Sequence, residues 1–299
     1  MLGLLLAALT ARGRRPGNAR WLRSRLTMAP HRVGATQDAG NGDRMVMDIV
    51  AWWTMRALCR AIVAPYLDLR VRGLHHLPRA GPLLIACRHY HHFDDGCILL
   101  AVVPQPLHLL VALDWVSGRA HRRLLEWALD LVRWPVVLRT ERLEREPGRS
   151  AYRAEEAGRY LRRATCDAIG LLRQGRVLVI FPEAYPNVDS GFTLKANGDD
   201  FLSFRPGFIK LAQLAQQDGR TRVPIVPAGL SYRRNRRWHV TLRFGPPLFP
   251  EAWPDRCSLL RAVEEQVRLL SDPPQSDARP SPPRWGTRAD RRAGRSEPG

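Results

Sequence analysis

The sequence predicts an α/β fold, a layered mixed sheet with flanking helices. Four short apolar runs suit buried strands, at residues 83–86, 136–138, 177–181 and 223–226. Between the second and third runs, apolar residues recur at helical spacing over residues 157–172. Because strands that alternate with helices form layered sheets, we expect a single α/β domain over residues 45–271, which begins with an amphipathic helix.

The two ends of the chain are predicted to be disordered. Residues 1–44 form a basic extension with eight Arg and two Asp. Its apolar start is followed by Arg12, Arg14 and Arg15, whereas a signal peptide carries its basic residues in front, so no secretory signal is expected. The tail at residues 272–299 is rich in Pro, Ser and Arg.

Residues 45–66 have the pattern of an amphipathic helix. At helical spacing, Asp48, Arg56 and Arg60 fall on one side, and apolar residues cover most of the remainder. Three charges argue against a transmembrane span. Tryptophans at head-group depth suit a helix that lies in the lipid interface, which is our prediction. The alternative is a helix packed on the protein's own core.

Three further elements are predicted in the second half of the chain. The helical pattern at residues 157–172 is followed by Gly175, which offers a stop. Another helix opens near Pro206, with apolar residues at helical spacing behind it. Residues 237–245 alternate in polarity and predict a strand after a turn around Asn235.

The composition allows one substantial core and raises one alternative function. The chain has 299 residues, 45% of them hydrophobic, so two domains are not required. The net charge of +19 is compatible with a nucleic-acid-binding module. However, 45 of the 47 basic residues are arginines spread along the chain, and no zinc-finger spacing or RNA-binding motif accompanies them. We therefore expect no nucleic-acid partner.

A histidine and a carboxylate lie in one segment behind the first apolar run. The segment LLIACRHYHHFDDG, residues 83–96, places His89 after the strand and Asp94 five positions later. A carboxylate beside a histidine fixes its tautomer and stabilises the imidazolium, so such a pair can take a proton from a hydroxyl. We predict that His89 is a general base and that Asp94 orients it. The spacing alone is weak evidence, because about half of one His-x4-Asp match is expected by chance.

A rarer signal follows the third apolar run. Phe181, Pro182 and Glu183 stand at its end, and this tripeptide should occur only about 0.02 times by chance at this composition. Arg139 ends the second run in the same way. Since open α/β sheets bind ligands at the carboxyl ends of their strands, these residues predict a ligand site there.

This order of segments resembles the glycerolipid acyltransferase family, the 1-acylglycerol-3-phosphate acyltransferase-like enzymes with a His-x4-Asp motif. The resemblance extends from Gly73 to Pro247 and implies that residues 45–271 are an acyltransferase domain. It implies that His89 and Asp94 are catalytic. The residues that it implies at the acceptor site are Arg139, Phe181, Pro182 and Glu183.

The third segment departs from the family pattern Phe-Pro-Glu-Gly-x-Arg. Ala184 replaces the glycine, and Pro186 stands where the arginine would be. Arginine holds a phosphate through its planar fork, which proline cannot do, so the head group of the acceptor stays open. We predict that Lys195 and Arg205, which flank the following loop, substitute as substrate-binding cations.

Two other chemistries suit the residue types near His89. A metal site would use His89, His91, His92, Asp94 and Asp95, but their spacing differs from the familiar His-x-His-x-Asp-His block, so no metal is predicted. An acyl-thiol intermediate would use Cys87 or Cys97, but no histidine pairing with either is evident. The five cysteines are odd in number and widely spaced, which indicates a reduced cytosolic setting.

The resemblance implies an O-acyltransferase of phospholipid synthesis. It would move a fatty acyl group from an acyl thioester to a hydroxyl of a lysophospholipid such as 1-acylglycerol-3-phosphate. The expected donor is acyl-CoA or acyl carrier protein, and no bound cofactor is expected. The alternative acceptor has no phosphate, such as a glycolipid. We expect a peripheral or monotopic protein on the cytoplasmic face of the cell membrane, with the lipid surface as its partner.

Overall fold

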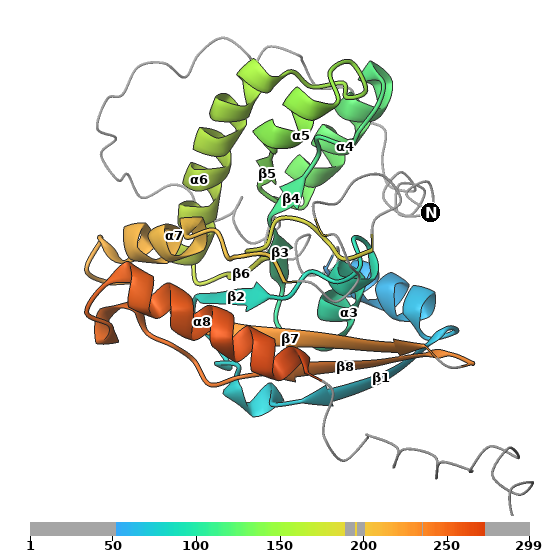
Figure 1. Cartoon of the computed structure of the whole chain (residues 1–299). Helices are drawn as coiled ribbons and strands as arrows, with labels where there is room; N and C mark the ends of the chain where they lie inside the picture. The colour runs from blue at the N-terminus through green and yellow to red at the C-terminus, as the bar shows by residue number, and fades with distance from the viewer. Residues whose placement is uncertain (1–51, 189–194, 196–200, 235, 273–299) are drawn as a thin grey trace, which may run out of the picture.

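A mixed six-stranded sheet forms the centre of the computed structural model of this chain (Figure 1). The structure describes residues 52–188, 195, 201–234 and 236–272. The strand order is β1-β8-β7-β2-β6-β3, and every neighbouring pair is parallel except β7 and β8. Helices flank this sheet, so the predicted fold class is confirmed.

The elements have the following bounds. The main sheet contains β1 (Leu67–Arg72), β2 (Leu83–Cys87), β3 (Leu107–Leu109), β6 (Val177–Ile180), β7 (Ile225–Arg234) and β8 (Trp238–Phe244). A parallel pair, β4 (Val111–Ala112) and β5 (Val136–Val137), forms a second sheet. The helices are one at residues 52–63, then α3 (Asp94–Val102), α4 (Arg119–Leu131), α5 (Thr140–Arg145), α6 (Ala157–Arg173), α7 (Gly207–Gln216) and α8 (Arg256–Ser271). Short 3-10 helices lie at Leu74–His76, Ala154–Glu156 and Pro250–Ala252.

Most of the predicted elements are present. The runs at residues 83–86 and 177–181 become β2 and β6, and the run at 223–226 leads into β7. The two predicted helices are α6 and α7, and the alternating segment is β8. The run at 136–138 becomes β5, which lies in the small sheet and not in the main one.

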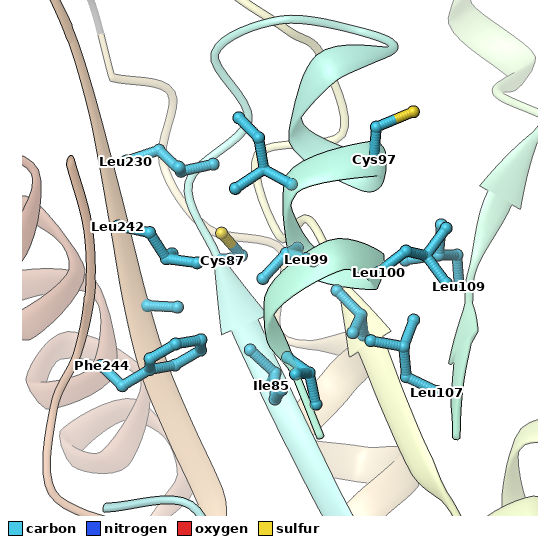
Figure 2. Packing of buried hydrophobic residues seen from close by; sticks show 14 of the residues in the cluster. Ile85, Cys87, Cys97, Leu99, Leu100, Leu107, Leu109, Leu230, Leu242 and Phe244 are labelled. Carbon is cyan, nitrogen blue, oxygen red and sulfur yellow. The ribbon is translucent and has the colours of Figure 1, made fainter. Parts of the chain in front are cut away.

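The central strands are buried on both faces because helices cover each side of the sheet. In β2, Ile85 and Cys87 face a core that includes α3, while Leu84 and Ala86 face a core that includes α6, α7 and α8. Figure 2 shows the first of these cores, with Leu99 of α3 lying over β2. Burial on both faces explains why these strands are continuous apolar runs in the sequence.

Helix α8 packs directly on β7 at Gly229. A Cβ atom at this position would lie 2.3 Å from the carbonyl carbon of Leu270, a distance that real contacts do not show. The close approach of the two backbones therefore requires a glycine in the strand.

The helix at residues 52–63 packs one face on the core of the protein, and the interfacial position predicted for residues 45–66 stays a prediction. Arg56 Nη1 donates a hydrogen bond to the Val103 carbonyl at 2.8 Å, and Arg60 Nε donates to the Ala101 carbonyl at 3.0 Å. These arginines satisfy the C-terminal carbonyls of α3, which have no partner within their own helix. The buried side chains of this helix are Trp52, Arg56, Cys59 and Val63.

Several predictions concern residues that the structure does not describe. The extension at residues 1–44, the first part of the 45–66 helix and the tail beyond residue 272 all lie outside the described residues. Within the described part of the chain, no helix is both long enough and apolar enough to cross a bilayer.

Candidate active site

His89 lies at the edge of the main sheet where β2 and β6 end. It follows β2 by two residues, and its ring stacks on Phe181, the residue after β6, with ring centroids 4.3 Å apart. Its side chain is 15% exposed, so one part of the ring is covered and another is accessible. The predicted proximity of the first and third segments is therefore present.

Asp95, and not the predicted Asp94, is the carboxylate that binds His89. Its Oδ2 lies 3.0 Å from His89 Nδ1 and accepts hydrogen bonds from the backbone N–H groups of Tyr90 and His91 at 2.6 and 3.0 Å. Its Oδ1 accepts a hydrogen bond of 2.6 Å from the hydroxyl of Tyr232, which lies on β7. Asp95 is fully buried, and these four donors hold its carboxylate in one orientation.

Asp94 points away from His89 because α3 begins at this residue. Consecutive side chains on an α-helix are rotated by about 100°, so only one of two adjacent carboxylates can face the histidine. Asp94 Oδ1 accepts a hydrogen bond of 2.8 Å from the Tyr66 hydroxyl, and Asp94 Oδ2 lies 3.4 Å from His91 Nδ1. The carboxylate in contact with His89 is thus one residue beyond the His-x4-Asp motif.

The contact with Asp95 fixes the tautomer of His89. An ionised carboxylate only accepts hydrogen bonds, so Nδ1 carries the proton and Nε2 carries the lone pair. Within the part of the chain that the structure describes, no group hydrogen-bonds Nε2. The ring is therefore set to accept a proton at Nε2, and Asp95 would stabilise the resulting imidazolium.

Glu183 is buried, and its carboxylate supports this loop. Its Oε1 accepts a hydrogen bond of 3.1 Å from the backbone N–H of His89, and its Oε2 accepts one of 3.2 Å from Leu202 N–H. The amine of Lys195 forms an ion pair with the same Oε2 and donates to the His89 carbonyl at 3.2 Å. Both side chains are fully buried, so Glu183 and Lys195 neutralise each other inside the protein, and the substrate role predicted for Lys195 stays a prediction.

Arg139 is also engaged within the protein. Its Nε and Nη2 donate to the buried carboxylate of Asp114, at 2.8 Å for the shorter Nη2 bond, and its Nη1 donates to the Ala184 carbonyl at 2.8 Å. Arg139 is 8% exposed and holds the Phe-Pro-Glu loop in place through the Ala184 carbonyl. Asp114 was not predicted from the sequence, where its only signal is a single acid inside the apolar stretch at residues 107–116.

Ala184 occupies a backbone conformation that favours glycine. Its φ is 64°, in the left-handed region, which costs a residue with a Cβ about 1–2 kcal/mol. This conformation gives a physical reason for the glycine in the family pattern. The contact from Arg139 to the Ala184 carbonyl helps to hold the strained turn.

Arg205 is the predicted cation that reaches the surface. Its side chain is 47% exposed, and its Nη2 donates to Glu141 at 2.9 Å. Its backbone N–H donates to the Pro182 carbonyl at 3.0 Å, which places it beside the Phe-Pro-Glu loop. The structure thus brings five predicted site residues together at the sheet edge: His89, Phe181, Pro182, Glu183 and Lys195. Arg139 and Arg205 both contact the Phe-Pro-Glu loop, at the carbonyls of Ala184 and Pro182.

Burial determines the ionisation of the other polar groups near His89. It raises the pKa of the Tyr232 phenol, with the Asp95 charge as the next cause, so Tyr232 stays a donor to Asp95. Burial likewise raises the pKa of the Cys87 thiol, which keeps it protonated and unreactive. The five cysteines, all within the described residues, are free thiols.

No group of three or more His, Cys, Asp or Glu side chains in the described residues is arranged to hold a metal ion. A cavity of about 250 Å³ is lined by Asp114, Trp115, Arg142 and Arg149 among others. It does not include His89, so it is separate from the proton-accepting edge.

Comparisons with known proteins find one family model and similar solved structures. The chain matches a protein-family model described as Acyltransferase over residues 68–231, which is more than half of its length. The search of curated proteins finds no match. One similar solved structure is the 1-acyl-sn-glycerophosphate (LPA) acyltransferase PlsC from Thermotoga maritima, with 15% identity and a TM-score of 0.47 over 77% of this chain and 86% of that chain.

Proposed function

Because the chain belongs to the acyltransferase family, we propose that it moves a fatty acyl group from an acyl thioester to a hydroxyl of a lysophospholipid such as 1-acylglycerol-3-phosphate. The observation that carries this proposal is the His89–Asp95 pair, whose Nε2 is set to accept a proton at the open edge of the sheet. The donor is acyl-CoA or acyl carrier protein.

The reaction is a direct transfer. His89 Nε2 takes the proton of the acceptor hydroxyl as its oxygen bonds to the thioester carbonyl carbon. The tetrahedral intermediate then collapses, the carbon–sulfur bond breaks, and the imidazolium returns the proton to the leaving thiolate. Asp95 stabilises the imidazolium between these steps. Cys87, the thiol nearest in sequence, stays protonated and forms no acyl intermediate.

A second candidate is the same reaction on an acceptor without a phosphate, such as a glycolipid. It is favoured by the internal partners of two predicted cations, since Arg139 binds Asp114 and Lys195 binds Glu183. Pro186 also stands where the family pattern has its arginine. If the acceptor carries a phosphate, Arg205 is the cation that binds its head group.

We also propose a peripheral location at the cytoplasmic face of the cell membrane. The acceptor is a membrane lipid, acyl thioesters are cytosolic donors in this scheme, and the free thiols suit a reducing compartment.

The test is acyl transfer by the purified protein from acyl-CoA or acyl carrier protein to matched acceptors with and without a phosphate. Product lipid and released thiol are both measured. Arg205→Ala is compared with Arg220→Ala, a change at another exposed arginine. A phosphate acceptor predicts that only Arg205→Ala raises the Michaelis constant for the phosphorylated lipid. Thioester hydrolysis without any acylated lipid would overturn the proposal.

A further inference from the structure

Helix α4 carries an apolar stripe that no part of the described protein covers. Leu124, Trp127 and Leu131 are 40%, 50% and 51% exposed. Their spacing of three and four residues places them on one side of the helix. The other side packs inward, where Leu125 and Leu129 belong to the small core beneath β4 and β5. The helix is thus apolar on two sides, and only one of them is explained by the fold.

The C-terminal end of α4 lies next to the helix at residues 52–63. A small cavity between the two helices is lined by Trp52 and Met55 from one side and by Leu131 and Trp134 from the other. Trp53 stacks edge-on against Trp52 and is 55% exposed. Figure 1 shows this helix, in blue, and α4 on the same side of the molecule. Exposed apolar side chains gathered on neighbouring helices mark an interaction site.

The charge around the stripe indicates which kind of partner binds there. Arg119, Arg123 and Arg133 are exposed at α4 and its C-terminal end. Asp130, the exposed acid on the same flank, is ion-paired with Arg163 at 2.7 Å. The surface therefore combines large apolar side chains with unbalanced positive charge. An apolar stripe with tryptophan and flanking arginines suits the interface of an anionic bilayer.

We propose that the stripe of α4, Leu124, Trp127 and Leu131, docks on anionic membrane lipid together with Trp53. Arg119 and Arg123 would then lie at head-group depth. This inference rests on the proposed function, because it explains how an enzyme of lipid acceptors meets its substrate. In the described part of the 52–63 helix, the large apolar side chains other than Trp53 are mostly turned to the core, so α4 supplies most of the apolar surface of this contact.

The first experiment measures vesicle binding by co-sedimentation with two matched double variants. Leu124→Ser with Leu131→Ser alters the stripe, and Leu161→Ser with Leu269→Ser alters two exposed leucines on α6 and α8, 59% and 62% exposed. On phosphatidylglycerol vesicles, the stripe variant is expected to bind about tenfold more weakly and the control to bind normally. Equal binding by both double variants would overturn the proposal.

The second experiment tests the charge. Arg119→Gln and Arg123→Gln should each weaken binding to phosphatidylglycerol vesicles by about fivefold at low salt, with little effect on phosphatidylcholine vesicles. The exposed Arg220 and Arg261 provide matched controls. An equal effect of the α4 and control arginines would contradict docking at this face.

Two readouts separate this inference from the proposed function. The stripe variant should transfer acyl groups at the normal rate to an acceptor dispersed in detergent, because His89 and Asp95 are unchanged. Vesicle binding through α4 by a protein without acyl transfer would overturn the function alone. The unaltered protein could also form a dimer that the stripe substitutions dissociate without changing vesicle binding. That result would show that a second copy covers the stripe, and it would overturn the inference.

Discussion

Replacing Asp95 or Asp94 by Asn distinguishes the two adjacent carboxylates. Asp95 binds His89 Nδ1 and three other donors, whereas Asp94 binds the Tyr66 hydroxyl. In Asp95→Asn the imidazolium loses its counter-charge, and the amide can hold the ring in the wrong tautomer. The loss expected for failed general-base catalysis is about 10²–10⁴-fold in kcat. In Asp94→Asn the amide oxygen still accepts from Tyr66, so the loss should stay within about threefold.

The assay is steady-state acyl transfer by purified variants, with thermal unfolding to verify that each is folded. Asp95→Asn should also lose about 1–3 kcal/mol of stability, because charge-assisted hydrogen bonds become neutral ones. A severe loss of kcat in folded Asp94→Asn, with Asp95→Asn near normal, would refute the orientation of the pair and return the role to the spacing-predicted residue.

Three further changes test the supports around the site. Tyr232→Phe removes the 2.6 Å bond to Asp95 and should lower kcat by about 10-fold with little change in KM, as a lost hydrogen bond to a charged group requires; an unchanged kcat would contradict the positioning role. Gly229→Ala should destabilise the protein by about 1–3 kcal/mol in urea unfolding, while Gly170→Ala, a helical site with open space, should be neutral or stabilising. Lys195→Ala should cost about 3–5 kcal/mol of stability by leaving a buried carboxylate unpaired; a stable variant with a raised acceptor KM would instead restore its predicted substrate role.

The central strands were predictable because a strand that is buried on both faces consists of apolar residues, and such a run can be recognised in the sequence. β2 and β6 are covered on both faces and therefore read as continuous apolar runs. β1 was missed because it is an edge strand that pairs only with β8, and its exposed positions are charged. β3 and β4, with three and two residues, are too short to leave a pattern.

The candidate site was predictable as a set of segments and not as a set of contacts. The sequence located His89 and the Phe-Pro-Glu tripeptide because both follow apolar strands. It could not tell Asp94 from Asp95, since that choice depends on where α3 begins. It also could not show that Arg139 is held by Asp114, which lies 25 residues earlier in the chain. Long-range ion pairs of this kind are fixed by the fold alone.

The helix at residues 52–63 illustrates a different limit. Arg56 and Arg60 are charged and therefore suggested a water-facing side, but both cap the carbonyls at the end of α3. An arginine on an amphipathic helix has the same pattern whether it meets water, lipid or an unpaired helix terminus. The pattern alone therefore cannot choose between a surface helix and a core helix.

The acyl-transfer rate of purified, folded His89→Ala protein tests the central claim most directly. The account predicts a fall of about 10²–10⁴-fold, because the variant lacks the imidazole that takes the proton and that Asp95 orients. His75→Ala, at an exposed histidine outside the site, provides the matched control and should keep the normal rate. Near-normal transfer by His89→Ala, with the same acceptor and donor, would contradict the mechanism.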